Sequence, residues 1–232
     1  FLDDVIRQPG NPSGFPSRWG SVQADYEMDP EVVNDARYRD RIRESLLALP
    51  SMSLVTETDD MFGSSGIYTH SNSSGVAWER AGSAELIYPN GQEGFQLNCG
   101  IRIQGGWFRS HSGTRKHSFR LLFKNAYGRS KLRFPLFGED AVDAFDTLTL
   151  RAGANDGYAW SSAKYTEQYT RDEFGRSLQR GTGQVGAHGT FVHLYVNGLY
   201  WGLYNPVERP DNAFSASYYG GEKEEWDSIH DG

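Results

Sequence analysis

The stretch 100–120 combines glycines and cations at a spacing that can bind phosphate. It is predicted to form a strand, a polar turn containing Gly105, Gly106 and Gly113, and a second strand that follows Lys116. Glycines allow backbone N–H groups to approach a phosphate, and a lysine at the edge of the next strand can reach the phosphate oxygens. The pattern indicates a phosphoryl-transfer site, with a basic hairpin whose cations merely face solvent as the alternative.

Other motifs in the chain do not support a different chemistry. The string GTGQVG at 181–186 has the letters of a dinucleotide-binding fingerprint, but it follows a predicted helix and precedes a predicted strand, which reverses the required order. The six histidines include no HExxH pair, and no GxSxG string occurs. Zinc chemistry and a serine hydrolase therefore have no support from the sequence.

Composition narrows the class of protein. The 232 residues carry a net charge of −7, so they provide no positive field for a nucleic-acid backbone, and nucleic acid is not expected as a partner. The sequence contains no run of about 20 apolar residues, which is the length that a membrane-spanning helix requires. The single cysteine, Cys99, excludes an internal disulfide. Aromatic residues at 14% together with 27 glycines are typical of a turn-rich sheet protein.

The N-terminal residues 1–50 are predicted to form a Pro- and Gly-rich arm followed by an amphipathic helix at 31–49. Asp29 is the expected N-cap of this helix, and Pro30 occupies its first turn. Because the chain opens without an initiator methionine or a signal segment, we expect it to be a piece of a longer protein. Residues 221–232 would then start a truncated C-terminal portion.

Between about 52 and 205 the hydrophobic period predicts a mostly antiparallel, twisted sheet. The clearest strands are 95–104 and 117–124, and Asn197–Gly198 is a strong signal for a tight hairpin. A helix is predicted at 162–179, packed on the sheet. The side chains expected to point inward from this helix are Tyr165, Tyr169, Phe174 and Leu178.

Several strings together resemble one known family, the CotH-like atypical protein kinases, named after a spore coat protein. The likeness runs through GIRIQGG, RKHSFRLLFKNAYG, LRFPLF, YTRDEFGRSL and FVHLYVNGLYWGLYNPVERPD, and it covers roughly residues 95–220. The lead GFPSRWG is similar to one that precedes the kinase-like part in large secreted bacterial members. The resemblance implies an α+β fold: a divergent protein-kinase-like N-terminal portion, with a sheet, a packed helix and an additional N-terminal helix.

The same resemblance implies a nucleotide-binding lobe at 51–220. Its glycine-containing hairpin would cover the nucleotide, and Lys116 would contact the phosphates. A kinase holds this lysine with a helix glutamate, for which Glu173 in the RDEF string is preferred over Glu167. The nucleotide-binding residues predicted in this way are Lys116, Gly105, Gly106, Arg102, Glu173, Glu208 and Asp211.

Glu208 and Asp211 belong to the ERPD string, which is typical of the family. They are predicted to line or brace the nucleotide cleft at the point where the chain leaves the sheet. The alternative for Glu208 is a surface ion pair with Arg209, which would contribute little to stability.

The activity implied by the family is transfer of phosphate from ATP, with Mg²⁺ or Mn²⁺, to Ser or Thr of a secreted or coat protein outside the cell. The family's catalytic and metal-binding aspartates are expected beyond Gly232, and WDSIHDG at 226–232 resembles the linker strand that precedes them. Without a magnesium ligand the γ-phosphate charge is not neutralised, so this stretch alone is expected to lack turnover.

A non-catalytic cell-surface or carbohydrate-binding module is the alternative from another class, and a pseudokinase scaffold is a third. In the carbohydrate-binding alternative, Trp78, Trp107, Trp160 and Trp201 would form a stacking platform. The kinase-like interpretation requires Trp201 to be buried in the aromatic hairpin. Trp107, in the glycine-containing turn, is expected to be exposed in either case.

Overall fold

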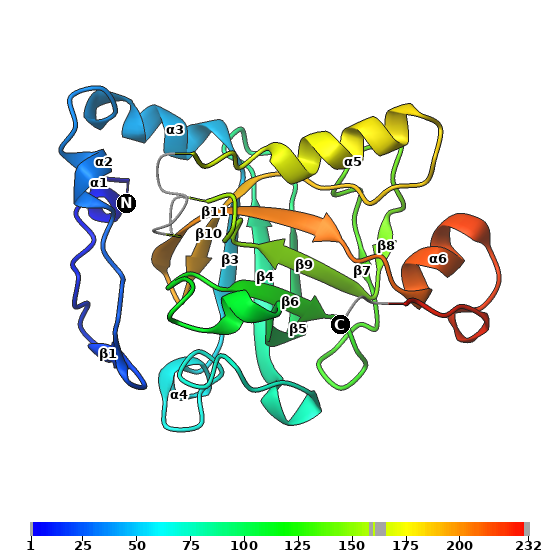
Figure 1. Cartoon of the computed structure of the whole chain (residues 1–232), viewed down its shortest axis with the longest axis horizontal. Helices are drawn as coiled ribbons and strands as arrows, with labels where there is room; N and C mark the ends of the chain where they lie inside the picture. The colour runs from blue at the N-terminus through cyan, green and yellow to red at the C-terminus, as the bar shows by residue number, and fades with distance from the viewer. Residues whose placement is uncertain (1, 158–159, 161–165, 230–232) are drawn as a thin grey trace.

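Seven strands form the body of the molecule, of which the structure, a computed structural model, describes residues 2–157, 160 and 166–229. The strands are β3 (Ser51–Val55), β4 (Arg80–Ile87), β5 (Phe95–Gln104), β6 (Ser118–Leu122), β9 (Thr147–Arg151), β10 (Val192–Val196) and β11 (Leu199–Glu208). They are hydrogen-bonded in the order β10-β11-β9-β6-β5-β4-β3, and the sheet closes into a barrel (Figure 1). All neighbouring pairs are antiparallel except β10 and β3, whose parallel pairing closes the barrel. The predicted antiparallel character is confirmed, whereas the closure was not predicted.

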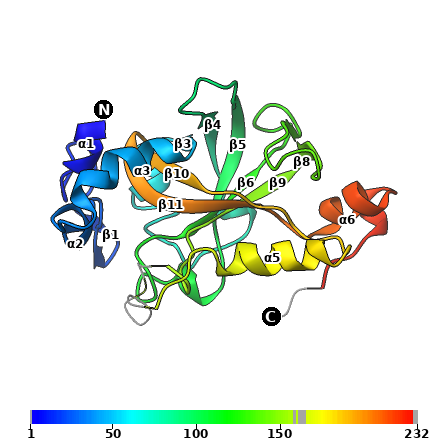
Figure 2. The same ribbon diagram turned by 90° about the horizontal axis from the view of Figure 1, so that it is seen from above.

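Short helices and two-stranded ribbons surround the barrel. In Figure 2 the N-terminal segments lie at one end of the barrel, α6 lies at the other, and α5 runs along one side. No helix in the described part of the chain is both long and apolar enough to cross a bilayer. The α-helices are α1 (Leu2–Ile6), α2 (Pro30–Val33), α3 (Ile42–Ala48), α4 (Thr58–Phe62), α5 (Arg171–Gly181) and α6 (Asn212–Tyr219). The 3-10 turns are Arg39–Arg41, Val76–Trp78, Trp107–Arg109 and Lys223–Glu225. The ribbons pair β1 (Arg18–Trp19) with β2 (Val22–Gln23), and β7 (Leu132–Arg133) with β8 (Ala144–Phe145).

Alternating side chains explain why the strands curl around an apolar interior. Along β5, Cys99, Ile101 and Ile103 are buried, whereas Arg102 between them lies on the outer face. The turn between β10 and β11 is Asn197–Gly198, with φ of 49° and 84°, the left-handed conformation that a tight two-residue hairpin requires. Both elements were predicted from the sequence, and both are confirmed.

Aromatic side chains of the N-terminal arm complete the core. Trp19 has no exposed surface, and its ring lies 5.5 Å from the ring of Trp201 and 4.7 Å from that of Tyr68. Trp201 Nε1 donates a hydrogen bond to Tyr68 Oη at 3.2 Å. The arm is therefore part of the hydrophobic core, because one of its own tryptophans fills the barrel end.

The predicted helix at 31–49 is interrupted. Its start is confirmed, because Asp29 accepts a hydrogen bond from a backbone N–H of α2 at 2.8 Å and Pro30 occupies the first position. After α2, the Asp35 carboxylate accepts hydrogen bonds from the Arg37 backbone N–H and guanidinium. Such local side-chain bonds compete with helical ones, so the chain turns before α3 begins.

Helix α5 begins later than predicted. It starts at Arg171, and residues 166–170 before it form turns rather than helix. The segment 162–165, with Tyr165, lies outside the described residues. The Gln168 backbone N–H donates to Asp156 O at 3.0 Å, so this segment is tied to a loop and cannot join the helix.

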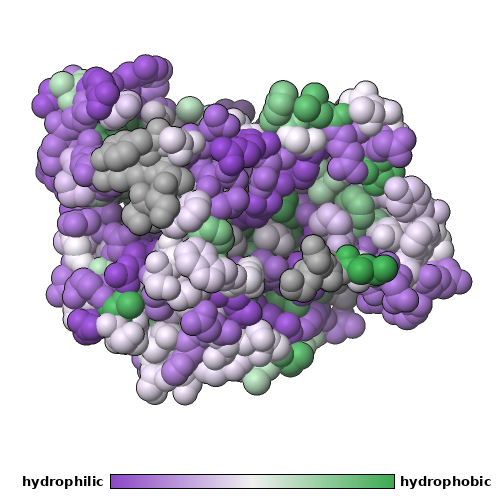
Figure 3. Space-filling view, in the orientation of Figure 1, coloured by the Kyte–Doolittle hydropathy of each residue, from purple (hydrophilic) through white to green (hydrophobic). Residues whose placement is uncertain are grey.

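The face of α5 that points toward the barrel also differs from the prediction. Phe174 and Leu178 were expected to point inward, but they are 64% and 55% exposed, and apolar surface is visible over α5 in Figure 3. The inward face instead carries Glu173, Arg176 and Arg180, which bond one another or the β11 region. The prediction failed because the sheet surface under α5 is polar, so a charged helix face packs against it.

Trp201→Ala is expected to lower the free energy of unfolding by about 3–5 kcal/mol, because it leaves a cavity among buried rings. Trp107, 61% exposed, provides the matched control, and Trp107→Ala is expected to cost less than about 1 kcal/mol. Urea unfolding followed by far-UV circular dichroism measures both. Equal losses in the two variants would contradict the placement of Trp201 in the core.

Candidate functional site

The outer face of β5, β6, β9 and β11 carries polar side chains in register. Arg102 of β5 lies opposite Arg120 of β6, which lies opposite Thr149 of β9. Arg151 follows on β9 two residues later and therefore projects from the same face. In Figure 1 this face is framed by α5 above and by α6 on the right. These strands thus have a polar outer surface, called the floor below, around the apolar barrel interior.

A cavity of about 390 Å³ lies on this floor. The turn between β5 and β6, residues 105–117, forms one wall and is called the glycine turn below. Helix α5 and the segment that follows β11 form two further walls. The lining contains three arginines and one glutamate, so its formal charge is positive, and we name it the arginine cavity. Its polar lining residues are Gln104, Ser118, Thr149, Arg151, Asn155, Arg176, Glu208 and Arg209.

Arg151 links the floor of the arginine cavity to α5. Its guanidinium forms an ion pair with the carboxylate of Asp172 in the first turn of the helix. Both side chains are about one-third exposed. The pair orients a cation at the cavity while leaving it accessible to a ligand.

Arg176 enters the cavity from α5 and is held by two partners. Its Nη2 atom donates to Glu173 Oε2 at 2.8 Å and to Asn205 Oδ1 at 2.7 Å. Burial raises the pKa of Glu173, but the hydrogen bond and charge of Arg176, together with hydrogen bonds from Asn205 and Arg180, outweigh this effect and keep the pKa below its ordinary value. The Nε atom of Arg176 is buried and has no partner among the described residues.

The segment after β11 is fixed by a buried carboxylate. Glu208 is 2% exposed, and it accepts hydrogen bonds from the His188 backbone N–H at 2.7 Å and from Tyr218 Oη at 2.8 Å. The alternative of a surface ion pair between Glu208 and Arg209 is therefore wrong. Arg209 instead lies next to Asp211, with Nε 3.6 Å from Oδ2. This separation is too long for a hydrogen bond, and the Nε atom has no other partner in the described chain.

The glycine turn opens its backbone toward the arginine cavity. Gly105 has a φ of 126°, which a side chain would strain. A carbon placed on Gly106 would meet no atom within 4 Å, so space remains beside this backbone. Gly113 differs, because a carbon there would lie 2.8 Å from the ring of Trp107. The first two glycines therefore match the backbone access that phosphate binding needs.

The structure brings several of the predicted nucleotide-binding residues together. Gly105, Gly106 and Glu208 all line the arginine cavity. Glu173 lies behind the cavity wall, where it holds Arg176 rather than a lysine. These residues come from the glycine turn, α5 and β11, which are distant in sequence and adjacent in the fold.

Arg102 and Asp211, and the less favoured Glu167, lie elsewhere. Arg102 forms an ion pair with Glu79 at 2.5 Å, and Glu79 is only 3% exposed. Asp211 accepts from the Phe214 backbone N–H at 3.2 Å and so caps α6. Glu167, the second candidate for holding the lysine, lies in the turns before α5 and not on the helix.

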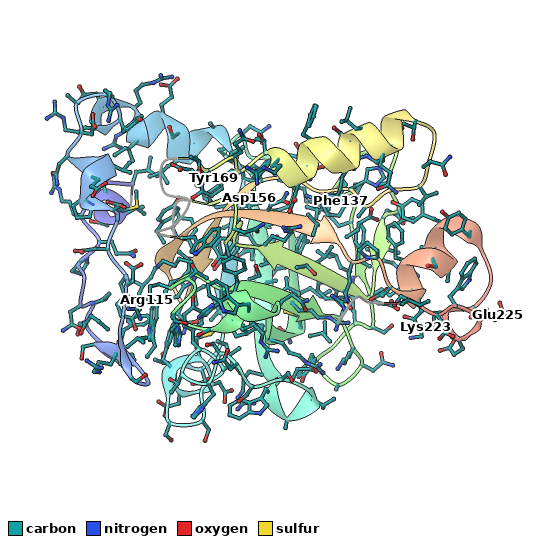
Figure 4. The ribbon with its side chains drawn as sticks, in the orientation of Figure 1. Arg115, Phe137, Asp156, Tyr169, Lys223 and Glu225 are labelled. Carbon is teal, nitrogen blue, oxygen red and sulfur yellow. The ribbon has the colours of Figure 1, made fainter. Side chains whose placement is uncertain are left out.

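Lys116 lies on the opposite side of the glycine turn, against the N-terminal arm. Its Nζ atom donates to Asp25 O at 2.6 Å and lies 4.3 Å from the centroid of the Trp201 ring. Burial lowers the pKa of Lys116 to about 8, against the opposing charge of Asp25. Arg115 lies on the same arm-facing side in Figure 4. The structure therefore does not place Lys116 with the lining of the arginine cavity.

Sequence reasoning missed the three arginines that give the cavity its charge. Arg151 ends the predicted strand FDTLTLR on its polar face, and Arg176 follows Glu173 at the helical spacing of three. Arg209 was considered only as a partner of Glu208. The strand position of Arg151 and the helical spacing of Arg176 were visible in the sequence. The pairing of β9 with β11 brings these residues together, and because it is long-range, no local pattern predicts it.

A larger cavity of about 750 Å³ lies between the β6–β9 region and α6. Its lining contains four bases and four acids, so it has no excess of positive charge. Its lysines are already paired, for example Lys131 with Asp146 at 2.9 Å and Lys124 with Glu79 at 2.8 Å. The smaller arginine cavity is therefore the better candidate for binding an anion.

The described residues do not provide a metal centre. No three His, Cys, Asp or Glu side chains converge in the part of the chain that the structure describes. The one carboxylate that lines the arginine cavity, that of Glu208, is already bonded to His188 and Tyr218. These residues therefore do not fit a divalent cation.

Glu208→Ala is expected to lower the free energy of unfolding by about 2–4 kcal/mol, because the buried donors of His188 and Tyr218 lose their acceptor. Glu208→Gln keeps a carbonyl acceptor and is expected to cost less. Glu224→Ala, at an exposed position, serves as the control. Thermal denaturation measures all three, and a loss as small as that of the control would show that Glu208 does not brace the segment.

The comparison with known protein families gives a match over the part of the chain that forms the arginine cavity. A family model described as CotH kinase protein matches residues 101–227, a range that includes the glycine turn, β9, α5 and the β10–β11 hairpin. No curated protein matched the sequence. The family match spans more than half of the chain and contains every arginine of the cavity. The chain therefore belongs to the CotH kinase protein family.

Proposed function

We propose that the arginine cavity binds the phosphates of ATP, as the nucleotide-binding part of a CotH kinase. The observation that carries the proposal is the convergence of three arginines with the open backbone of Gly105 and Gly106. Arginine guanidinium groups bind phosphate oxygens strongly, and bare glycine N–H groups add donors without side-chain hindrance.

The order of elements supports the same proposal. In protein kinases, a glycine-rich loop joins the first two strands, a cation on the third strand contacts the phosphates, and an acid on the next helix holds that cation. Here the glycine turn joins β5 to β6, β9 is the next strand in the barrel, and α5 follows β9 in the chain. The pair of Arg151 and Asp172 then takes the place of the lysine and glutamate.

The proposed reaction is transfer of the ATP γ-phosphate to a Ser or Thr hydroxyl of a secreted or coat protein. In such a reaction the protein mainly positions the phosphates and compensates their charge. Arg151, Arg176 and Arg209 would do this for the non-transferred part of the nucleotide. None of the residues that line the arginine cavity is assigned the role of activating the hydroxyl or of holding Mg²⁺ or Mn²⁺. We propose a bacterial, extracellular protein on the basis of the family resemblance alone.

The carbohydrate-binding alternative has less support. Trp201 is 1% exposed, as the kinase-like interpretation required, and Trp78 packs against the core. Trp107 and Trp160 lie near each other, with centroids 6.5 Å apart and planes at 70°. The four tryptophans therefore do not form one stacking platform. A pseudokinase scaffold would use the same fold for protein contacts, and absence of ATP binding would favour it.

Arg151→Ala is expected to weaken ATP binding by this 232-residue chain about tenfold or more, since a charge-assisted contact is lost. Titration calorimetry with ATP at fixed salt measures the affinity. Arg133→Ala, at an exposed position on β7, is the matched control and should leave the affinity unchanged. Absence of ATP binding by the unaltered chain would contradict the proposal.

Lys116→Met tests the site that the sequence predicted. If the arginine cavity binds the phosphates, this variant keeps most of its affinity for ATP, because Lys116 faces Asp25 and Trp201. Circular dichroism of the variant checks that the arm remains packed. Loss of binding in a folded Lys116→Met variant, with unchanged binding in Arg151→Ala, would place the phosphates at Lys116 instead.

A further inference from the structure

Two histidines of the glycine turn form a continuous chain of contacts between two backbone carbonyls. His117 Nδ1 lies 3.0 Å from Phe108 O, and His117 Nε2 lies 2.9 Å from His111 Nδ1. At the other end, His111 Nε2 lies 2.9 Å from Tyr68 O. All three separations are hydrogen-bond distances, and each of the four ring nitrogens takes part. The arginine cavity makes no use of either ring.

Counting hydrogens shows that two neutral rings cannot satisfy this chain. A neutral imidazole carries one N–H, and a backbone carbonyl carries none. The three contacts need three hydrogens, whereas neutral His111 and His117 together supply two. Whichever tautomers are present, one contact then brings two lone pairs together. A single additional proton supplies the missing hydrogen and satisfies all three contacts at once.

The surroundings of the pair oppose this proton. His117 is fully buried, and burial lowers its pKa to about 3, with the charge of His111 when it is protonated, and those of Arg109 and Lys116, acting in the same direction. Burial also lowers the pKa of His111, and Arg115 contributes in the same direction. The pair is therefore neutral at neutral pH, and one of its contacts is then repulsive.

The other titratable groups near the pair are two tyrosines, which stay neutral, and one aspartate, which does not bond to either ring. Tyr68 donates its hydroxyl hydrogen to Arg115 O at 2.9 Å, and Tyr204 donates to His117 O at 2.8 Å. Burial raises the pKa of both tyrosines well above the ordinary value. Asp25, whose charge acts on Lys116 and Tyr68, is the acid on the arm side. No carboxylate among the described residues bonds to either ring.

We propose that His111 and His117 form a single proton-binding site that controls the glycine turn. A proton taken up from water in acid is held between the two rings and completes the chain of hydrogen bonds. It thereby fixes the backbone of Phe108 to that of Tyr68. At neutral pH one contact is repulsive, and the turn is held less tightly. Because Phe108 lines the arginine cavity, the proton also acts on the cavity wall, whatever ligand the cavity binds.

Nitrogen-15 NMR of the histidine rings in the unaltered chain tests the proton count directly. The expected result is uptake of one proton by the pair, with both rings changing together and a midpoint below the ordinary value of 6.5. His111→Gln identifies the ring signals and removes the shared step. Exposed His70, which lies outside the pair, serves as the internal reference. Independent titration of the two rings, or no uptake down to about pH 4, would overturn the proposal.

Amide hydrogen exchange tests the structural consequence. After correction for the intrinsic pH dependence, protection of residues 105–113 should rise on the order of tenfold when the pair takes up its proton, since one hydrogen bond is gained. His70→Gln should show the same rise, and His117→Gln should show none. If His117→Gln does not fold, the pH dependence of amide protection in the unaltered chain decides the outcome. Proton uptake without any change in protection would show that the pair does not control the turn.

Discussion

Closure of the barrel is the constraint on which the rest of the structure depends. The parallel pairing of β10 with β3 joins the two ends of the sheet, so the apolar side chains of all seven strands share one interior. With that interior filled, charged strand residues have only the outer face available, because an unpaired charge in the core would be very costly. Arg102, Arg120 and Arg151 of β5, β6 and β9 therefore lie outside the barrel, where Arg151 lines the cavity together with Arg176 of α5 and Arg209 after β11. The cavity and its charge follow from this arrangement.

Sequence patterns predicted the fold best where its determinants are local. The strand 95–104 and the hairpin at Asn197–Gly198 follow from alternation and from a tight turn, and the cap at Asp29 needs only neighbouring residues. Barrel closure pairs strands that lie more than 130 residues apart, and no local pattern reports such a contact. The orientation of α5 was predicted wrongly for the same reason. Its apolar side chains, such as Phe174, would point inward against an apolar sheet, and the sheet here is polar.

The candidate site shows the same division between local and long-range information. Gly105, Gly106 and Glu208 belong to contiguous strings that resemble CotH kinases, and the structure places all three at the cavity. The resemblance did not indicate Arg151, which becomes part of the site only through the pairing of β9 with its neighbours. Lys116 illustrates the opposite case. Its string fits the family, but the side chain is enclosed by the N-terminal arm, a segment outside the matched range.

The proposed nucleotide site lies between the glycine turn, β9 and the segment after β11. Hydrogen–deuterium exchange of the chain, with and without ATP, tests it most directly, because it locates the ligand without altering any residue. The account predicts that ATP protects backbone amides at 104–109, 149–155 and 207–211, and leaves the N-terminal arm unchanged. Protection confined to the arm and to residues around Lys116, or to the larger cavity beside α6, would contradict the account.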